Sequence, residues 1–414
     1  LKELRGNVSE ATLRAIRGQL LSYGTSALAH QAREGKARIV LTFAGQAQTY
    51  FDDLIRLYEI PAARKVIDVC GLALEEEMAN GAGLEGLHPQ GLNLIDWLQN
   101  EDTRPPNESL KDSAVSQPLI FVAQAAQLAA LERFGFAPES IADWAVATTG
   151  HSQGIMAALL ASEAHTPETL PGRAAEMACY MLWQGIGMQS SWGRNGANEC
   201  PMVAITGLPR ERVEEAIQGL EVVIALTNAP RRFVASGQPA DLELMIQRLE
   251  TRHAMEQGAF EKGLASRPFG TGLERLSVSA PFHSPFMSDA LPELKKRTKK
   301  MNLWPKPEKL VVPMIRTETG EVWNGEDLSE SQSINPVDWI VTMEGARRFN
   351  PTHVIDAGPG AGVSPVSALC MRGFGVQVIA AATDEGETTL CARDAQSIKP
   401  PAQWAEYAPR SVVR

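Results

Sequence analysis

The sequence predicts an α/β fold in which a main domain is interrupted by a smaller unit of mixed strands and helices. One observation is the G-x-S-x-G motif at 150–154, set between a short apolar stretch, 143–147, and a run of helix formers, 155–160. A second is the change near residue 199 from long helical patterns to short, alternating strands and helices. A chain of 414 residues is also too long for one typical domain.

Composition narrows the class of protein. Hydrophobic residues make up 44% and charged residues 21%, which is ordinary for a globular chain. The formal charge of −10 gives no overall attraction to nucleic acid or to an anionic membrane. The five cysteines are scattered without a C-x-x-C pair, which favours a reducing, cytoplasmic location and argues against structural zinc. We see no run of about 18 apolar residues and therefore expect no membrane span.

An N-terminal helical segment, 1–37, is expected before the main domain. A strand follows at 37–43 and leads at once into the small-residue turn Ala44-Gly45-Gln46. Such a turn after an early strand can present backbone N–H groups to a ligand, or it can be an ordinary connection; spacing favours neither. The pattern from 51 to 140 is mainly helical. We place the first segment of the main domain at 38–198.

The interrupting unit is expected at 199–279. Its predicted strands are 202–206, 222–226, 232–236 and 276–279, and its predicted helices are 210–218 and 240–250. This βαββαβ order is the ferredoxin-like pattern, with an exposed loop expected at 253–272. The main domain resumes at 280–395, with strands at 310–315 and 353–356. The chain opens on Leu1 without methionine and ends in 396–414, which we interpret as a linker to a following domain of a longer polypeptide.

A serine hydroxyl needs a base within hydrogen-bond reach to act as a nucleophile. Ser152 falls on the predicted strand-to-helix turn, where the N–H of Gln153 is free to bind an oxyanion. Among the seven histidines, His283 lies in a Pro-flanked turn at the junction of the two domains, where sites are favoured. A catalytic role and a structural role are about equally supported there. For His151, packing is the better interpretation.

Six ordered motifs together resemble the acyltransferase family, which includes malonyl-CoA:acyl carrier protein transacylases and the acyltransferase domains of fatty acid and polyketide synthases. They are Phe43-Ala44-Gly45-Gln46, Gly150 to Gly154, Gly185 to Gln189, Thr227 to Pro230, Ser279 to Ser284 and Asp356 to Gly360. The resemblance covers roughly 38–380 and implies an α/β-hydrolase-like core with an inserted ferredoxin-like subdomain.

The resemblance also implies roles for individual residues. Ser152 would be the nucleophile and His283 the general base and acid, and the backbone N–H groups of Gln46 and Gln153 would form the oxyanion hole. A main-chain carbonyl orients the histidine in this family, and Gln332 matches that position. This would explain why no acidic residue completes a triad. Substrate-binding positions would be Gln184, Asn228 and Phe282.

The main departure from members that transfer malonyl groups lies at the position that would pair with a charged substrate. Those members have an arginine immediately before the G-x-x-M-Q stretch, where this chain has Gln184. A neutral amide cannot replace the bidentate pairing of a guanidinium with a carboxylate, so an uncharged acyl group such as acetyl is favoured. The sequence Gly150-His-Ser-Gln-Gly154 also looks like the acetyl-loading domain of type I fatty acid synthases. Bacterial synthases are more similar overall than fungal ones; fungal polyketide starter-unit domains, often with cysteine at position 152, are the near competitor.

The resemblance therefore implies transfer of an acetyl starter from acetyl-CoA to the phosphopantetheine thiol of an acyl carrier protein, through an acyl-serine. No bound cofactor or metal is expected. Expected partners are the acyl-CoA, the carrier protein and other domains of a type I synthase, with a homo-oligomeric parent. Alternatives are transfer of malonyl or another acyl group, a serine thioesterase or esterase, and an inactive scaffold domain.

Overall fold

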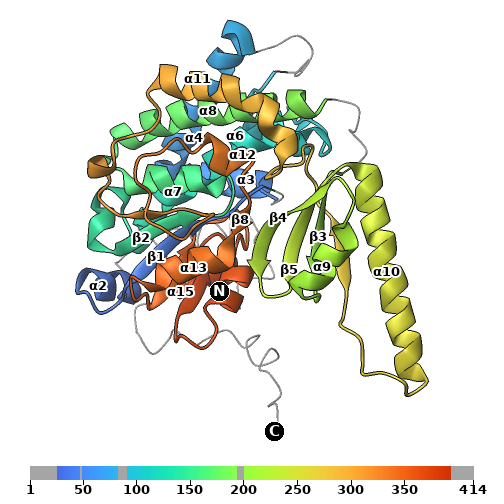
Figure 1. Cartoon of the computed structure of the whole chain (residues 1–414). Coiled ribbons are helices and arrows are strands. Elements are labelled where there is room, and N and C mark those ends of the chain that lie inside the picture. The colour runs from blue at the N-terminus through green and yellow to red at the C-terminus, as the bar shows by residue number, and fades with distance from the viewer. Residues whose placement is uncertain (1–25, 47–48, 83–90, 194–199, 393–414) are drawn as a thin grey trace, which may run out of the picture.

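The computed structural model describes residues 26–46, 49–82, 91–193 and 200–392 (Figure 1). The expected linker at 396–414 and most of the expected N-terminal segment at 1–37 lie outside the described residues. Inside that segment, helix α2, Ala27–Arg33, begins at Ser26, whose side chain accepts a hydrogen bond from the N–H of Ala29. No disulfide links the five cysteines, all of which are described.

The main domain is built on a five-stranded sheet with the order β10-β9-β1-β2-β7. All neighbouring strands are parallel. The strands are β1 Ile39–Phe43, β2 Ala145–Gly150, β7 Met314–Ile315, β9 His353–Asp356 and β10 Gln377–Ala380. Phe43 pairs with Gly150, and Thr42 pairs with Asp356. The turns that follow β1, β2 and β9 therefore lie side by side at the carboxyl edge of the sheet.

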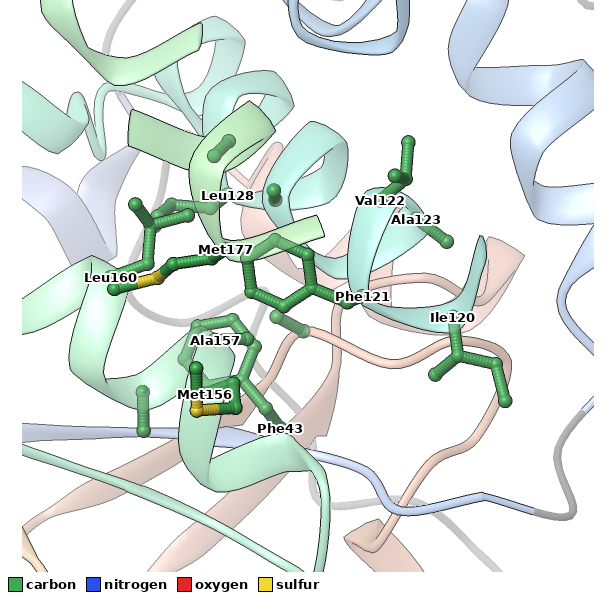
Figure 2. Close-up of a cluster of buried hydrophobic side chains, with 14 of the residues drawn as sticks. Phe43, Ile120, Phe121, Val122, Ala123, Leu128, Met156, Ala157, Leu160 and Met177 are labelled. Carbon is green, nitrogen blue, oxygen red and sulfur yellow. The ribbon is translucent and has the colours of Figure 1, made fainter. Parts of the chain in front are cut away.

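Both faces of this sheet are covered by helices, as its parallel pairing requires. Every residue of β1 is buried, and its side chains alternate between two apolar clusters. Figure 2 shows the larger cluster, in which Phe43 lies with Phe121, Met156 and Met177 from three helices. These helices are α6 Ser113–Ala130, α7 Gly154–Ser162 and α8 Thr169–Trp192. The opposite face is covered by α13 Trp339–Arg347 and α14 Ser364–Cys370.

The stretch Ser113–Phe134, which contains α6, is long and apolar enough to cross a membrane by length and composition. Every residue of that apolar window is buried inside the fold, which is typical of the core helix of a globular domain. Its polar residues have partners within the protein: the Gln124 amide donates to the carbonyls of Ala44 and Gly358. The remaining helices of the main domain are α3 Phe51–Tyr58, α4 Pro61–Glu77, α5 Leu94–Gln99, α11 Leu291–Met301, α12 Ser329–Ser333 and α15 Asp384–Leu390.

The smaller domain has the elements expected of a ferredoxin-like unit. They are β3 Met202–Thr206, α9 Arg210–Ile217, β4 Val222–Ala229, β5 Arg232–Gly237, α10 Pro239–Glu261 and β6 Gly272–Arg275. Strand order is β6-β3-β5-β4 with antiparallel neighbours. The main domain adds a fifth strand, β8 Val337–Asp338, parallel to β4, so the two domains share this sheet (Figure 1).

Three of these sequence-based boundaries are wrong by four residues or more. Helix α10 continues to Glu261, into the expected loop at 253–272, because ion pairs and hydrogen bonds four residues apart, such as Arg252–Glu256, support its polar second half. The last strand lies at 272–275 and not at 276–279, whose apolar residues pack against the main core. Strand β7 is restricted to 314–315, since Pro313 has no N–H to donate.

Candidate active site

The turn between β2 and α7 places Ser152 at the carboxyl edge of the main sheet. Ser152 has a φ of 54°, a left-handed conformation that is unusual for a residue with a side chain. Glycine is required on both sides. A Cβ on Gly150 would lie 2.0 Å from the backbone carbon of Gly154, and a Cβ on Gly154 would lie 2.4 Å from the carbonyl oxygen of Phe43. The motif thus builds a tight strand-to-helix turn that directs the Ser152 hydroxyl outward.

His283, which follows the inserted domain in the sequence, contacts Ser152. The Ser152 Oγ lies 2.7 Å from the Nε2 of His283, and the His283 Nδ1 lies 2.7 Å from the carbonyl oxygen of Asn335. Since a carbonyl only accepts, Nδ1 carries the proton and Nε2 is left to accept from the serine hydroxyl. The backbone N–H of His283 donates to the Ser333 carbonyl. The structure therefore brings together Ser152 and His283, the residues that we expected to be the nucleophile and the base.

The orienting carbonyl belongs to Asn335, and the prediction of Gln332 is wrong. Gln332 lies inside α12, Ser329–Ser333, whereas Asn335 lies beyond the helix, immediately before Pro336. A residue before proline is biased away from helical conformation, so its carbonyl is free to bind a ring nitrogen. Backbone acceptors have no side-chain signature; the Asn-Pro pair after a short helix was the only signal in the sequence.

Burial sets the protonation state of His283. The side chain is 2% exposed, and this desolvation lowers the pKa of His283 to about 4. The hydrogen bond to the Asn335 carbonyl acts in the opposite direction, and the nearby His151 lowers the pKa further. His283 is therefore neutral at pH 7, which is the form that can accept a proton from Ser152.

The backbone N–H groups of Gln46 and Gln153, the two expected oxyanion donors, make no hydrogen bond within the described residues. The turn that carries Gln46 approaches closely, since a Cβ on Gly45 would lie 3.1 Å from the Cβ of Ser152. The Gln46 side chain is anchored to α6 by Ser116, 2.7 Å away, and by Gln117, 2.8 Å away. Unused donors beside a nucleophile can stabilise a developing oxyanion.

Asn228, expected to bind substrate, uses its side-chain oxygen to bind His151, whose Nε2 is 2.7 Å away. Asn228 lies on β4 of the small domain and His151 precedes the nucleophile, so this bond connects the two domains beside the site. The His151 ring also packs edge-on against the Trp339 ring, with 5.3 Å between the ring centroids. Burial lowers the pKa of His151, which keeps it neutral. The packing role expected for His151 thus includes a polar contact that the sequence did not indicate.

The other two expected substrate positions are buried. Phe282 is 4% exposed and directly precedes His283. Gln184 is 1% exposed on α8, and neither atom of its side-chain amide has a partner among the described residues. Among the described residues, no hydrogen bond joins Phe282 or Gln184 to Ser152. In the part of the chain that the structure describes, no group of three or more His, Cys, Asp or Glu residues could hold a metal ion.

The profile of a family described as starter unit:ACP transacylase in aflatoxin biosynthesis matches residues 41–257, just over half of the chain. The chain belongs to this family. Among curated proteins, it is 28% identical over 422 residues to the fatty acid synthase subunit beta of Saccharomyces cerevisiae, covering 92% of this chain. It is 28% identical over 437 residues to that of Schizosaccharomyces pombe, covering 96%. The chain spans about a fifth of the length of these relatives, 20% in both cases.

The fold of this acyltransferase domain is also found in solved structures. The MCAT of Mycobacterium tuberculosis matches with a TM-score of 0.62 and 20% identity, over 86% of this chain and 100% of that one. A type II polyketide malonyl-transacylase solved with its acyl carrier protein matches with a TM-score of 0.62 and 18% identity, over 86% and 99%. These matches confirm the predicted α/β-hydrolase-like core with a ferredoxin-like subdomain. The greater similarity to bacterial than to fungal synthases stays a prediction.

Proposed function

We propose that this domain transfers an acetyl group from acetyl-CoA to the phosphopantetheine thiol of an acyl carrier protein, through an acyl-Ser152 intermediate. The observation that supports the proposal most is the chain of contacts from Ser152 Oγ through His283 to the Asn335 carbonyl, each 2.7 Å long. The two unused N–H groups of Gln46 and Gln153 lie beside it. Nucleophile, neutral base and oxyanion donors are the three parts that acyl transfer needs.

In the first half-reaction, His283 Nε2 takes the proton of the Ser152 hydroxyl while Oγ attacks the thioester carbonyl of acetyl-CoA. The N–H groups of Gln46 and Gln153 stabilise the oxyanion, assisted by the N-terminus of α7. The intermediate collapses, the carbon–sulfur bond breaks, and His283 returns its proton to the leaving CoA sulfur. Acetyl-Ser152 and free CoA are the products.

The second half-reaction reverses these steps with a different thiol. His283 takes the proton of the phosphopantetheine thiol, the sulfur attacks acetyl-Ser152, and Ser152 leaves with the proton that His283 returns. Acetyl-CoA and the phosphopantetheine thiol of the carrier protein are the substrates, and no resident cofactor takes part in these steps. The carrier, other domains of a larger synthase, a cytoplasmic location and a homo-oligomeric parent are part of this proposal. The names of the relatives, fatty acid synthase β subunits, support it.

The choice of acetyl rests on Gln184. This buried side chain is neutral, and a malonyl carboxylate buried beside it would lack a cationic partner there. Malonyl transfer is the second candidate, because the solved structures of the same fold include malonyl transacylases. Loading of the two acyl groups on Ser152 distinguishes these candidates.

The decisive experiment is intact-mass spectrometry of the chain after exposure to acetyl-CoA. We expect one acetyl adduct on wild type, and none on Ser152→Ala, because only a serine oxygen can form the ester. Addition of a phosphopantetheinylated carrier protein should then discharge the adduct and acetylate the carrier. An adduct that persists in Ser152→Ala would overturn the assignment. Rapid loss of the adduct to water without a carrier would favour a thioesterase.

The charge argument predicts the effect of Gln184→Arg. A guanidinium at this position should pair with a malonyl carboxylate and raise the malonyl-to-acetyl loading ratio by about tenfold or more. Gln184→Met is the matched control, since it changes the side chain without adding charge and should not raise malonyl loading. Competition between equal concentrations of the two CoA esters, read by mass, measures the ratio. Equal malonyl and acetyl loading by wild type would contradict the argument.

A further inference from the structure

The turn after β1 that carries Gln46 has few backbone contacts of its own. Among the described residues, neither Gly45 nor Gln46 uses its backbone N–H or carbonyl in a hydrogen bond. The turn of the other expected donor, Gln153, is closed by backbone bonds: the N–H of Gly154 donates to the carbonyl of His151, 2.9 Å away. The orientation of the Gln46 N–H therefore depends on contacts made by side chains.

The side-chain amide of Gln46 is bound at both ends. Its Nε2 donates to the Ser116 hydroxyl, 2.7 Å away, and its Oε1 accepts from the Nε2 of Gln117, 2.8 Å away. Ser116 is 3% exposed and Gln117 is 2% exposed, so water cannot readily replace a lost partner. Two bonds to opposite ends of one planar amide fix its direction as well as its position. Adjacent residues of α6 thus hold the turn after β1.

The start of α6 is itself fixed by neighbouring segments. The N–H of Ser113 donates to the Ser279 hydroxyl, 3.0 Å away, and the N–H of Ala114 donates to the Oε1 of Gln189, 3.3 Å away. Side chains thereby satisfy two of the N–H groups that a helix start leaves unpaired. A Cβ on Gly185 would lie 2.2 Å from the Ser113 carbonyl oxygen, so the backbone of α8 packs directly against this turn. The anchor of Gln46 is therefore rigid.

We propose that Ser116 and Gln117 are positioning residues that direct the backbone N–H of Gln46 toward the oxyanion formed during acylation of Ser152. They act through the Gln46 side chain and do not touch the reacting atoms. An oxyanion donor works only within about 3 Å of the oxygen that becomes negative, and loss of one donor slows an enzyme by roughly 10²–10³-fold. This inference rests on the proposed function and deepens it, because it names the residues that preorganise one donor.

The charge on the oxygen develops in the transition state, so the proposed anchor should affect the rate of acylation and not the affinity for acetyl-CoA. The measurement is quenched single-turnover acylation of the whole chain over a range of acetyl-CoA concentrations, read by intact mass. Gln46→Ala keeps the backbone N–H and removes both anchoring bonds. We expect the maximal rate to fall by roughly 30-fold, with the half-saturating concentration changed less than about threefold.

Ser116→Ala removes one of the two anchoring bonds. Alanine favours the helix, so α6 should still form, and we expect the maximal rate to fall by roughly tenfold. Gln117→Met keeps the side-chain length, removes the other bond and should act in the same direction, which keeps the test valid if one variant fails to fold.

A double variant distinguishes action through Gln46 from a general effect on the fold. In the Gln46→Ala background the anchoring bonds are already absent, so adding Ser116→Ala should slow acylation by less than about twofold further. Two substitutions that act independently would instead multiply their effects.

The matched control is Gln127→Met, which changes a buried glutamine farther along α6. The Gln127 amide donates to the carbonyl of Ala381 and accepts from Arg56, and it has no contact with the turn that carries Gln46. We expect this variant to lower the thermal stability while acylation per folded molecule stays within about twofold of wild type.

Two results would overturn the inference. One is a Gln46→Ala variant that acylates at the wild-type rate, which would show that the side chain does not position the donor. The other is a double variant whose loss is the product of the two single losses. Both results require a wild type that acetyl-CoA acylates, so they leave the proposed function intact. A wild type that no CoA ester acylates would contradict the proposed function and this inference together.

Discussion

Two glycine-containing turns flank β1 at the carboxyl edge of the main sheet, one after β2 and one after β9. Each presents a polar side chain, Ser152 in the first and Asp356 in the second. Ser152 binds His283, and unused N–H groups lie beside it. The oxygens of Asp356 are already taken, by the N–H of Gly358 and by the N–H and hydroxyl of Ser364. Hydrogen-bonding groups that remain available distinguish a reactive turn from a structural one.

The structural turn nevertheless supports the reactive one. The N–H of Ala44 donates to the carbonyl of Gly358, 3.2 Å away, and the Gln124 amide bridges the carbonyls of both residues. Asp356 fixes the turn after β9 so tightly that a Cβ on Gly362 would lie 2.4 Å from its carboxylate. The turn that carries Gln46 is thus held in place by a hydrogen-bond network that does not include Ser152.

Loss of the base should give the largest effect. His283→Gln removes the acceptor of the Ser152 proton, so we expect acylation by acetyl-CoA to slow by roughly 10³-fold or more. The measurement is quenched single-turnover acylation, read by intact mass. His353→Gln is the matched control, since it changes a part-buried histidine at the start of β9 that has no contact with Ser152. A His283→Gln enzyme that acylates at the wild-type rate would remove the distinction between the two turns.

Asp356→Ala should affect stability more than chemistry. It leaves three donors without an acceptor, one buried and two part-buried, which should lower the free energy of unfolding by about 3 kcal/mol. Urea unfolding measures this change. As a control, Asp338→Ala removes a part-buried carboxylate that caps α13 and should cost only about 1 kcal/mol. Acylation per folded molecule should stay within a few fold; a loss comparable to that of His283→Gln would mean that the second turn takes part in the reaction.

The sequence could predict the features that depend on residue type. It could not predict those that depend on a backbone group or on a contact between domains. Glycines, apolar flanks and strand patterns indicated the elbow at Ser152 and the ferredoxin-like unit, because sterics and burial act through residue type. The second half of α10 was missed because polar pairs, and not an apolar face, stabilise it. Asn335 was missed because its role belongs to a backbone carbonyl. The contact of His151 with Asn228 joins residues of different domains, which no local pattern encodes.

The smallest expected change in rate is the pH dependence of acylation. It should distinguish the turn at Ser152 from the turn at Asp356. His283 acts when neutral, and its pKa is about 4, so acylation should be nearly constant from pH 8 to pH 5.5 and half lost near pH 4. Burial raises the pKa of Asp356 to about 6, within the flat range. Quenched acylation at closely spaced pH values would detect a break near pH 6, which would mean that titration of Asp356 reaches the reactive turn.

The stability contributions of the two groups should have opposite signs. The lowered pKa of His283 favours folding above its unfolded value of 6.5, and this contribution is lost as the pH falls toward 4. The raised pKa of Asp356 favours folding below its unfolded value of 3.8, and this contribution is lost as the pH rises through 6. Between pH 6.5 and pH 5, His283→Gln should therefore lose less stability on acidification than wild type does. An identical slope in urea unfolding would show that His283 is not held neutral by burial.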